Sequence, residues 1–344
     1  MKIRLGTRGS ELALTQSRWV ADRIREAAVA AGEPVEVEEV VLRTQGDADQ
    51  LSPLHQHSTP GVFTKELERA LTADEIDLAV HSLKDLPTAT PAGLVIAAVP
   101  VREEPWDAWV SEKFPDLIDL PDGARVATGS LRRRAQILHA YPHLVVEGIR
   151  GNIDTRIAKS AERGDAGLIL AAAGLRRTGR TGHIRGTFSV SEMTPAPGQG
   201  ALALETRADD AATRTAVARV DDPRSHAEVI AERTFLAALE GGCHLPIGAF
   251  ARASSRALTL VGMVASPDGV RLVRMGTEGT IDDPTALGET LAVAVRRAGG
   301  EEILAAIAAD PAFARDVAAP DGPAAANDPA DSDDPADPDG ETDR

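Results

Sequence analysis

The chain has 344 residues, 43% of them hydrophobic, and a formal net charge of −16. A chain of this length predicts two or three domains, because one hydrophobic core rarely organises so many residues. The acidic balance, without a lysine-rich run, argues against nucleic acid as a partner, since phosphate binding draws on clustered positive charge. No apolar run approaches the roughly eighteen residues that a membrane helix needs, so the sequence predicts a soluble protein with no membrane partner.

Two features indicate a cytoplasmic protein. The first residues, MKIRLGTRGSELAL, lead directly into a folded pattern and lack the apolar stretch of a signal peptide. Cys243 is the only cysteine and cannot form an internal disulfide. Only five of the 37 basic residues are lysines, which leaves two explanations open: adaptation to a salt-rich cytoplasm, or GC-biased codon usage.

The first part of the chain predicts an α/β unit. KIRLGTR alternates like a strand, and Ser10 can cap a helix that runs to about Ala31 and presents one face with Trp19, Ile24 and Ala27 or Ala28. VEVEEVVLRT is a second predicted strand, TKELERAL a helix, and IDLAVHS a strand that breaks before Pro87. Strands that alternate with helices indicate a parallel sheet with crossover helices.

The alternation begins again after Asp122. ARVATG, LVVEGIRG and GLILAAAG are predicted strands, and SLRRRAQILHA and the stretch from about Asn152 to Arg163 are predicted helices. In both units, polar residues follow the carboxyl ends of predicted strands, where open α/β sheets bind their ligands. These polar clusters span residues 7–10, 81–85, 128–134 and 150–156.

MTPAPGQGALALE predicts a hinge or crossover before a further strand, and a third unit begins at about Asp221. Its first helix is SHAEVIAERTFLAALEGG, in which Ser225 and Glu228 match a capping box and Gly241 or Gly242 supplies the C-terminal stop. Residues 316–344 hold ten acidic residues, one basic residue and almost no large apolar side chain, so they predict a disordered tail.

Cys243 is predicted to lie just past the end of that helix, before a His-Leu-Pro turn. Reactive thiolates are favoured at helix N-termini or beside cations, so this is a poor position for a thiolate nucleophile. His244 does not improve it, because adjacent loop residues rarely point at one another. Cys243 is therefore a small buried hydrophobe or an exposed loop side chain, and the preceding Gly-Gly pair favours exposure.

TGSLRRRAQ places Arg132 and Arg133 in the first turn of a helix capped by Ser130, where the helix dipole disfavours positive side chains. An anion resolves this conflict, because backbone N–H groups and forked guanidinium donors together bind carboxylate or phosphate. Arg134 fits a solvated helix face better. Further arginines follow other strands, and together they predict a polyanionic small-molecule ligand: Arg8, Arg150, Arg156, Arg176 and Arg177.

The remaining motifs are weaker. Asp85 follows Lys84 at a strand end, where a carboxylate can act on a ligand or be an ordinary turn residue before Leu-Pro. His55 and His57 lack a third ligand at the usual spacing, so the sequence predicts no metal site. GQGA lacks the strand, the spacing and the later acid of a dinucleotide-binding motif.

Seven segments, in order over residues 2–310, resemble the hydroxymethylbilane synthase family, also called porphobilinogen deaminase: GTRGSELAL, GVFTKELERAL, DLAVHSLKDLPT, GSLRRRAQ, IRGNIDTR, PAPGQGALALE and LEGGCHLPIG. The resemblance implies an α/β fold of three domains. The first two are like the lobes of periplasmic binding proteins, with mainly parallel mixed sheets and the active site in the cleft between them, and the third is a small α+β domain with an open sheet. The expected boundaries are 1–100 with 200–220, then 101–199, then 221–315, followed by the tail 316–344.

The resemblance also implies a transferase reaction of porphyrin and heme biosynthesis. Four porphobilinogen molecules condense head to tail, each with release of ammonia, and the chain is then hydrolysed from a dipyrromethane cofactor as hydroxymethylbilane. In this family the cysteine that matches Cys243 holds the dipyrromethane, a primer of two linked pyrroles, through a thioether. Each pyrrole bears an acetate and a propionate, so the growing chain is a polyanion of the kind that the arginines predict.

By motif match, Asp85 is the family's catalytic aspartate, which holds pyrrole N–H groups and stabilises the positive charge that develops as ammonia leaves. The residues so expected to bind the cofactor are Cys243, Ser82, Lys84, Ser130, Arg132, Arg133, Arg150 and Arg156. Those expected to bind substrate are Arg8, Ser10, Phe63, Arg177 and Gln199. The family implies a monomer, and the sequence indicates no obligate protein partner.

Two segments depart from the family pattern. LSPLHQHSTPG stands where many relatives have a lysine- and glycine-bearing loop over the cleft, and the acidic tail has no counterpart. The alternative function is a two-lobed binding protein for an organic polyanion, without catalysis. That alternative explains the arginines but gives Asp85 and Cys243 no role.

Overall fold

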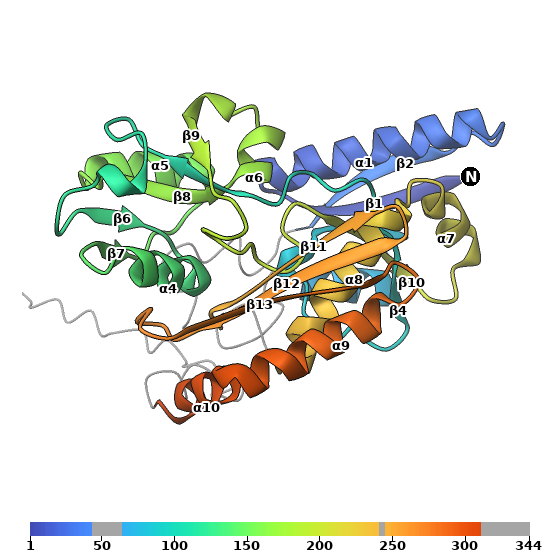
Figure 1. The fold of residues 1–344 in the computed structure, drawn as a ribbon. Coiled ribbons are helices and arrows are strands. Elements are labelled where there is room, and N and C mark those ends of the chain that lie inside the picture. Colours follow the sequence, from blue (N-terminus) through green and yellow to red (C-terminus); the bar gives the residue numbers. More distant parts are fainter. Residues whose placement is uncertain (43–63, 241–244, 311–344) are drawn as a thin grey trace, which may run out of the picture.

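The structure is a computed structural model that describes residues 1–42, 64–240 and 245–310. Two five-stranded sheets and one three-stranded sheet organise these described residues (Figure 1). Phe63, Cys243, His55, His57 and the tail 316–344 lie outside the described residues. Within the three described ranges, no helix has both the length and the apolar character needed to span a bilayer.

The first sheet has the strand order β2–β1–β3–β10–β4. β1 (Lys2–Arg8) pairs in parallel with β2 (Glu36–Leu42) and β3 (Leu78–Ser82), as the alternation of strands and helices predicts. β10 (Leu202–Arg207) lies antiparallel between β3 and β4 (Leu94–Ala98), although the whole second unit separates it from them in sequence. The first sheet is therefore mixed and mainly parallel.

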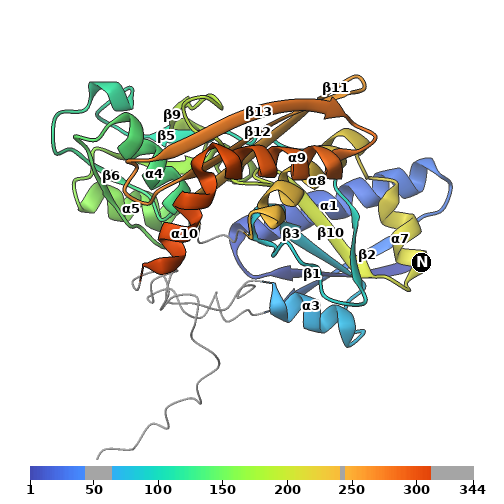
Figure 2. The same ribbon diagram turned by 60° about the horizontal axis from the view of Figure 1, so that its bottom comes forward.

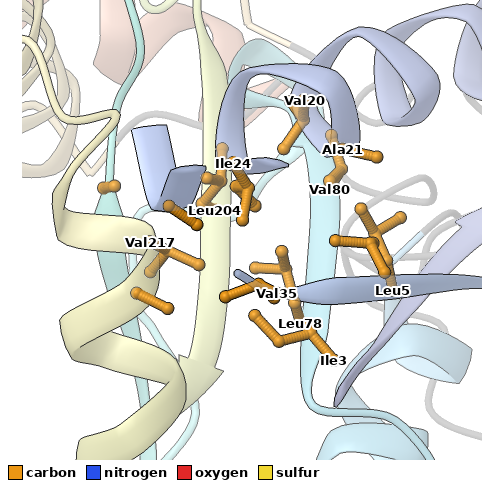
Figure 3. Close-up of a cluster of buried hydrophobic side chains, with 14 of the residues drawn as sticks. Ile3, Leu5, Val20, Ala21, Ile24, Val35, Leu78, Val80, Leu204 and Val217 are labelled. Atoms are coloured by element: carbon orange, nitrogen blue, oxygen red, sulfur yellow. The ribbon is translucent and has the colours of Figure 1, made fainter. Parts of the chain in front are cut away.

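Helix α1 (Glu11–Ala30) covers one face of this sheet, and α3 (Lys65–Thr72) precedes β3. Val20 and Ile24 of α1 pack toward Leu204 and the other buried side chains of the sheet (Figure 3). The prediction that Trp19 belongs to this buried face was wrong, because Trp19 is 41% exposed. The buried face starts one residue later than predicted, at Val20, and continues at four-residue spacing through Ile24 and Ala28.

The second sheet, ordered β7–β6–β8–β5–β9, has the same arrangement as the first. β6 (Arg125–Ala127) is parallel to β7 (Val145–Glu147) and β8 (Gly167–Ala171), and β5 (Asp107–Val110) runs antiparallel between β8 and β9 (Ile184–Thr187). The helices of this unit are α4 (Leu131–Ala140), α5 (Ile153–Glu162) and α6 (Ala172–Arg177). Short 3-10 turns, η3 (Leu117–Asp119) and η4 (Thr181–His183), join some of these elements.

The chain passes between the two sheets twice, once before β5 and once before β10, and the two crossovers touch. The backbone N–H of Glu103 donates a hydrogen bond of 3.2 Å to the carbonyl oxygen of Gly200. Gly200 has a φ of +86°, and a Cβ there would lie 2.3 Å from the oxygen of Glu103. The close approach of the crossovers therefore requires glycine at this position.

The third unit follows α7 (Ala211–Ala218) and combines an open antiparallel sheet with helices (Figure 2). Its elements are α8 (Pro223–Ala238), β11 (Ile247–Ser254), β12 (Ala257–Ala265), β13 (Leu272–Thr280), α9 (Pro284–Val295), the π-helical turn η5 (Arg296–Gly300) and α10 (Glu301–Ala309). The α/β fold class with a small α+β third unit is thus confirmed. The domain boundaries given above stay a prediction.

The predicted capping box at the start of α8 was wrong. Asp222 caps this helix by accepting a hydrogen bond of 2.8 Å from the backbone N–H of Ser225, and Pro223 occupies the first turn. Proline at that position has the helical φ already and lacks the N–H that would need a partner. Ser225 is buried instead, and its hydroxyl accepts a hydrogen bond from the backbone N–H of Arg102.

A buried ion pair fastens the crossovers to the third unit. Arg102 donates to both carboxylate oxygens of Glu232 on α8, at 2.7 and 3.0 Å, and the Arg102 side chain is 4% exposed. Glu232 also accepts hydrogen bonds from the backbone N–H groups of Gly198 and Ala251. Although burial raises the pKa of Glu232, all these donors stabilise its charged form.

Candidate active site

A short turn at the end of β3 carries two of the predicted site residues. Leu83–Asp85 forms the 3-10 turn η2, which places Lys84 partly in the interior and leaves Asp85 exposed. The turn begins with a hydrogen bond of 3.0 Å from the backbone N–H of Leu83 to the oxygen of Ala201, and the Leu83 side chain is buried. Asp85 therefore faces solvent, while Leu83 anchors the turn to the protein interior.

Arg132 and Arg133 are buried in the first turn of α4, and both bind Asp107 of β5. Arg132 Nη1 lies 2.7 Å from Asp107 Oδ2, and Arg133 Nη2 lies 2.7 Å from Oδ1. Gln199 Nε2 donates to the same Oδ1 at 2.9 Å. The carboxylate of Asp107 therefore supplies, from inside the protein, part of the negative charge that the two arginines require at a helix N-terminus.

Burial disfavours the charged forms of Asp107 and of the two arginines alike, and their mutual attraction offsets this cost. Burial alone would raise the pKa of Asp107, but Arg132 and Arg133 hold this pKa well below its usual range. Burial lowers the pKa of Arg133, and the charge of Arg132 lowers it further, against the effect of Asp107. Ser130 caps α4 by accepting a hydrogen bond of 3.4 Å from the backbone N–H of Arg133.

Lys84 brings the two lobes into electrostatic contact. Burial, together with the charges of Arg133 and Arg132 of the second lobe, lowers the pKa of its ammonium group to about 8, while Asp85 and Asp107 oppose the decrease. The structure therefore places the end of β3 close to the N-terminus of α4. The polar clusters of the two units meet there, as their positions at strand ends predict.

Arg156 on α5 completes this group. Its Nε donates a hydrogen bond of 2.7 Å to the oxygen of Gly151. Burial lowers its pKa to about 10, Arg133 and Arg150 contribute to the decrease, and Asp85 opposes it. We name the side chains Lys84, Arg132, Arg133, Arg150 and Arg156 the cationic cluster. Among the described residues, Asp85 and Asp107 are the carboxylates whose negative charge opposes the decrease in these pKa values.

The other predicted residues lie at the ends of neighbouring elements. Arg8 ends β1 and Ser10 caps α1, where its hydroxyl accepts from Ala13 at 3.4 Å. Ser82 ends β3 and exchanges hydrogen bonds with the Gln16 amide. Arg177 ends α6 and donates at 2.7 Å to the oxygen of Gly200, and burial lowers its pKa to about 10.

The sequence prediction missed Arg180, which joins the two lobes. Its guanidinium donates to both carboxylate oxygens of Glu11 on α1, each at 2.8 Å, and also binds Asp154 on α5. Glu11 directly follows Ser10 in the sequence, and Asp154 lies two residues before Arg156 on α5. This three-residue network therefore lies next to predicted site residues of both lobes.

The sequence prediction also missed Asp107. The only signal is an acidic residue at the start of the otherwise apolar strand DAWV, where all four residues are buried. A buried carboxylate needs positively charged partners, but the sequence alone does not say which of the many arginines supplies them.

Replacing Asp107 by asparagine is expected to destabilise the protein by about 3–5 kcal/mol, because it leaves the buried charges of Arg132 and Arg133 uncompensated. Urea unfolding of Asp107→Asn and of Asp122→Asn, an exposed position in the same lobe, measures the difference. Equal unfolding midpoints for the two variants would show that Asp107 does not hold the arginines.

Two family models match most of the chain. Residues 3–215 match the family model described as "Porphobilinogen deaminase, dipyromethane cofactor binding domain", and residues 226–296 match "Porphobilinogen deaminase, C-terminal domain". Among solved structures, lipoprotein Tp32 from Treponema pallidum aligns with a TM-score of 0.42 and 12% identity, over 64% of this chain and 90% of that chain.

Curated relatives match along almost their whole length. The porphobilinogen deaminase of Desulforudis audaxviator (strain MP104C) is 47% identical over 305 residues, which cover 89% of this chain and 97% of that protein. The porphobilinogen deaminase of Brevibacillus brevis (strain 47) is 45% identical over 307 residues, with the same coverage of both chains. On these matches, the chain belongs to the porphobilinogen deaminase family.

Proposed function

We propose that this chain catalyses the hydroxymethylbilane synthase reaction: it condenses four porphobilinogen molecules head to tail on a dipyrromethane primer, releases one ammonia at each step, and frees the product by hydrolysis. Family membership over residues 3–215 and 226–296 supports this activity. The observation that carries it is the cationic cluster around Asp85, because both the primer and the growing chain are polycarboxylates.

The residues present fit the dipyrromethane. Arg132 Nε is a buried donor that has no hydrogen-bond partner among the described residues, and it lies on a guanidinium whose Nη1 is already bound to Asp107. Such a donor is costly to bury unless a ligand satisfies it. Lys84 gains as well, because a ligand carboxylate offsets the burial that lowers the pKa of its ammonium group. When bound, the dipyrromethane supplies the free pyrrole carbon from which the chain grows.

The proposed roles of the side chains follow from their charge and position. Asp85 accepts hydrogen bonds from pyrrole N–H groups and stabilises the positive charge that develops as ammonia leaves. Cys243 anchors the primer through a thioether, after the end of α8 at Ala238. The side chains proposed to bind the primer's carboxylates are Ser82, Lys84, Ser130, Arg132, Arg133, Arg150 and Arg156.

Porphobilinogen and the growing pyrrole chain are proposed to bind beside the primer, at the neighbouring elements. Arg8, Ser10, Phe63, Arg177 and Gln199 are the side chains proposed to bind porphobilinogen and the growing chain. Gln199 Nε2 is engaged by Pro105 and Asp107, so its role is in part to hold the site. We also propose a cytoplasmic monomer, with the domains 1–100 and 200–220, 101–199 and 221–315.

Incubation of the purified protein with porphobilinogen tests the function. We expect four ammonia molecules for each hydroxymethylbilane released, measured by an ammonia assay and by oxidation of the product to a porphyrin. Binding of porphobilinogen without any release of ammonia would contradict the proposal and favour the alternative, a polyanion-binding protein without catalysis.

A further inference from the structure

Arg233 of α8 reaches from the third unit to the backbone that follows Asp85. Its Nη2 donates to the carbonyl oxygens of Pro87 at 2.7 Å and Thr88 at 3.1 Å, and its Nη1 lies 3.4 Å from the oxygen of Leu86. These three carbonyls belong to the segment on which the η2 turn ends. One charged, planar side chain thus binds three consecutive carbonyls from another part of the fold.

The entrance to the η2 turn is held differently from its exit. At the entrance, Leu83 donates its backbone N–H to Ala201, and its buried side chain packs against Gly198, where an added Cβ would lie 2.1 Å from Leu83 Cδ2. At the exit, Pro87 has no N–H to donate. Leu86 donates its backbone N–H to the oxygen of Leu83 within the turn, at 3.1 Å, and the hydrogen bonds of Arg233 tie this end of the turn to α8.

Apolar packing and an open pocket both adjoin the Arg233 contact. Leu83 and Leu86 pack with Val229 of α8 in one buried hydrophobic cluster. A surface pocket of about 200 Å³ lies beside this cluster, and its lining includes Leu83, Thr88 and Arg233. The hydrogen bonds of Arg233 to Pro87 and Thr88 therefore extend the attachment of the turn to α8 beyond the apolar contact.

Glu232, the neighbour of Arg233 on α8, holds the other side of the same turn. Its carboxylate accepts the backbone N–H of Gly198 at 2.6 Å, and Gly198 is the residue that packs on Leu83. Two consecutive residues of one helix therefore fix both sides of the η2 turn. The same helix ends at Ala238, five residues before Cys243.

We propose that Arg233 is a positioning residue for Asp85: by binding the carbonyls of residues 86–88, it keeps the Asp85 carboxylate in the place where it meets the reacting pyrrole. This inference rests on the proposed catalytic role of Asp85.

The experiment compares Arg233→Gln and Arg233→Lys with Arg224→Gln, an exposed arginine at the other end of α8. For each variant, intact mass reports the bound primer, thermal unfolding reports the fold, and steady-state ammonia release gives kcat and KM. A displacement of the catalytic group by about 1 Å costs on the order of 100-fold in rate. We expect Arg233→Gln to retain its primer and to lose 10- to 100-fold in kcat with a smaller change in KM. Arg233→Lys is expected to lie between it and the wild type.

A double variant separates a positioning role from a structural one. If Arg233 acts through Asp85, adding Arg233→Gln to Asp85→Asn leaves the residual rate nearly unchanged, because the carboxylate to be positioned is already gone. An equal fold loss in both backgrounds would overturn the proposal, as would a primer-loaded Arg233→Gln protein with wild-type kcat. If Arg233→Gln does not fold, the same comparison is made with Arg233→Lys. Wild-type activity in Asp85→Asn would instead contradict the role of Asp85 itself.

Discussion

Asp85→Asn is expected to lower kcat by at least about 100-fold while the protein stays folded and keeps its primer. Asparagine has the shape of aspartate but no charge, so it cannot stabilise the cation that forms as ammonia leaves. Asp85 is exposed, and its η2 turn is anchored through Leu83 and Ala201, so the substitution has little effect on the fold. Ammonia release under saturating porphobilinogen, together with a thermal unfolding curve, measures both expectations.

Asp209→Asn is the matched control, because it changes an exposed aspartate of the same lobe to the same residue outside the cationic cluster. It should retain wild-type kcat. A protein that only binds a polyanion would release no ammonia, so Asp85→Asn would have no rate to lower. If Asp85→Asn released ammonia as fast as the Asp209→Asn control, another acceptor would have to stabilise the cation.

Cys243→Ser is expected to yield a protein whose intact mass lacks the two linked pyrroles that the wild type carries. Cys243 is the only thiol in the chain, so no other side chain can form the thioether. Without the primer, the cationic cluster has lost its covalently bound polyanion, and formation of hydroxymethylbilane should fall to a small fraction of the wild-type rate. Mass spectrometry of both proteins, before and after incubation with porphobilinogen, measures the difference.

The wild-type protein is its own control in that measurement. If it is purified without added mass, incubation with porphobilinogen should add the two pyrroles to the wild type and not to Cys243→Ser. Full activity in Cys243→Ser, or the same added mass on both proteins, would show that the primer is not held by this sulfur.

Local sequence determines the helices and the parallel strands of the two lobes. Ser10 caps α1 and Ser130 caps α4, as predicted, because a serine side chain before an apolar periodic stretch satisfies the first free N–H groups of a helix. The same type of signal gave a wrong prediction at the start of α8. Ser225 and Glu228 have the spacing of a capping box, but both are buried and contact Arg102 instead. A pattern of polar residues does not reveal whether its partners are local or distant.

The antiparallel strands were harder to predict. β5 and β9 have four residues each, too few to show a period, and β9 is largely exposed. β10 was expected as a strand, but its insertion between β3 and β4 depends on the touching crossovers and on pairing across a long stretch of chain. Such pairings are set by the closure of the whole fold and not by neighbours in sequence.

The sequence by itself determined the family, the α/β class and the identity of the arginine-rich strand ends, because these depend on residue types and their order. Only the tertiary structure decided how those ends meet: it brought Lys84 of one lobe next to Arg132 and Arg133 of the other, and it supplied Asp107 as their buried counterion. It also brought Arg233 of the third unit to the turn after Asp85. Coulomb interactions and hydrogen bonds act over a few ångströms in space, and distance along the chain does not reveal which residues come that close.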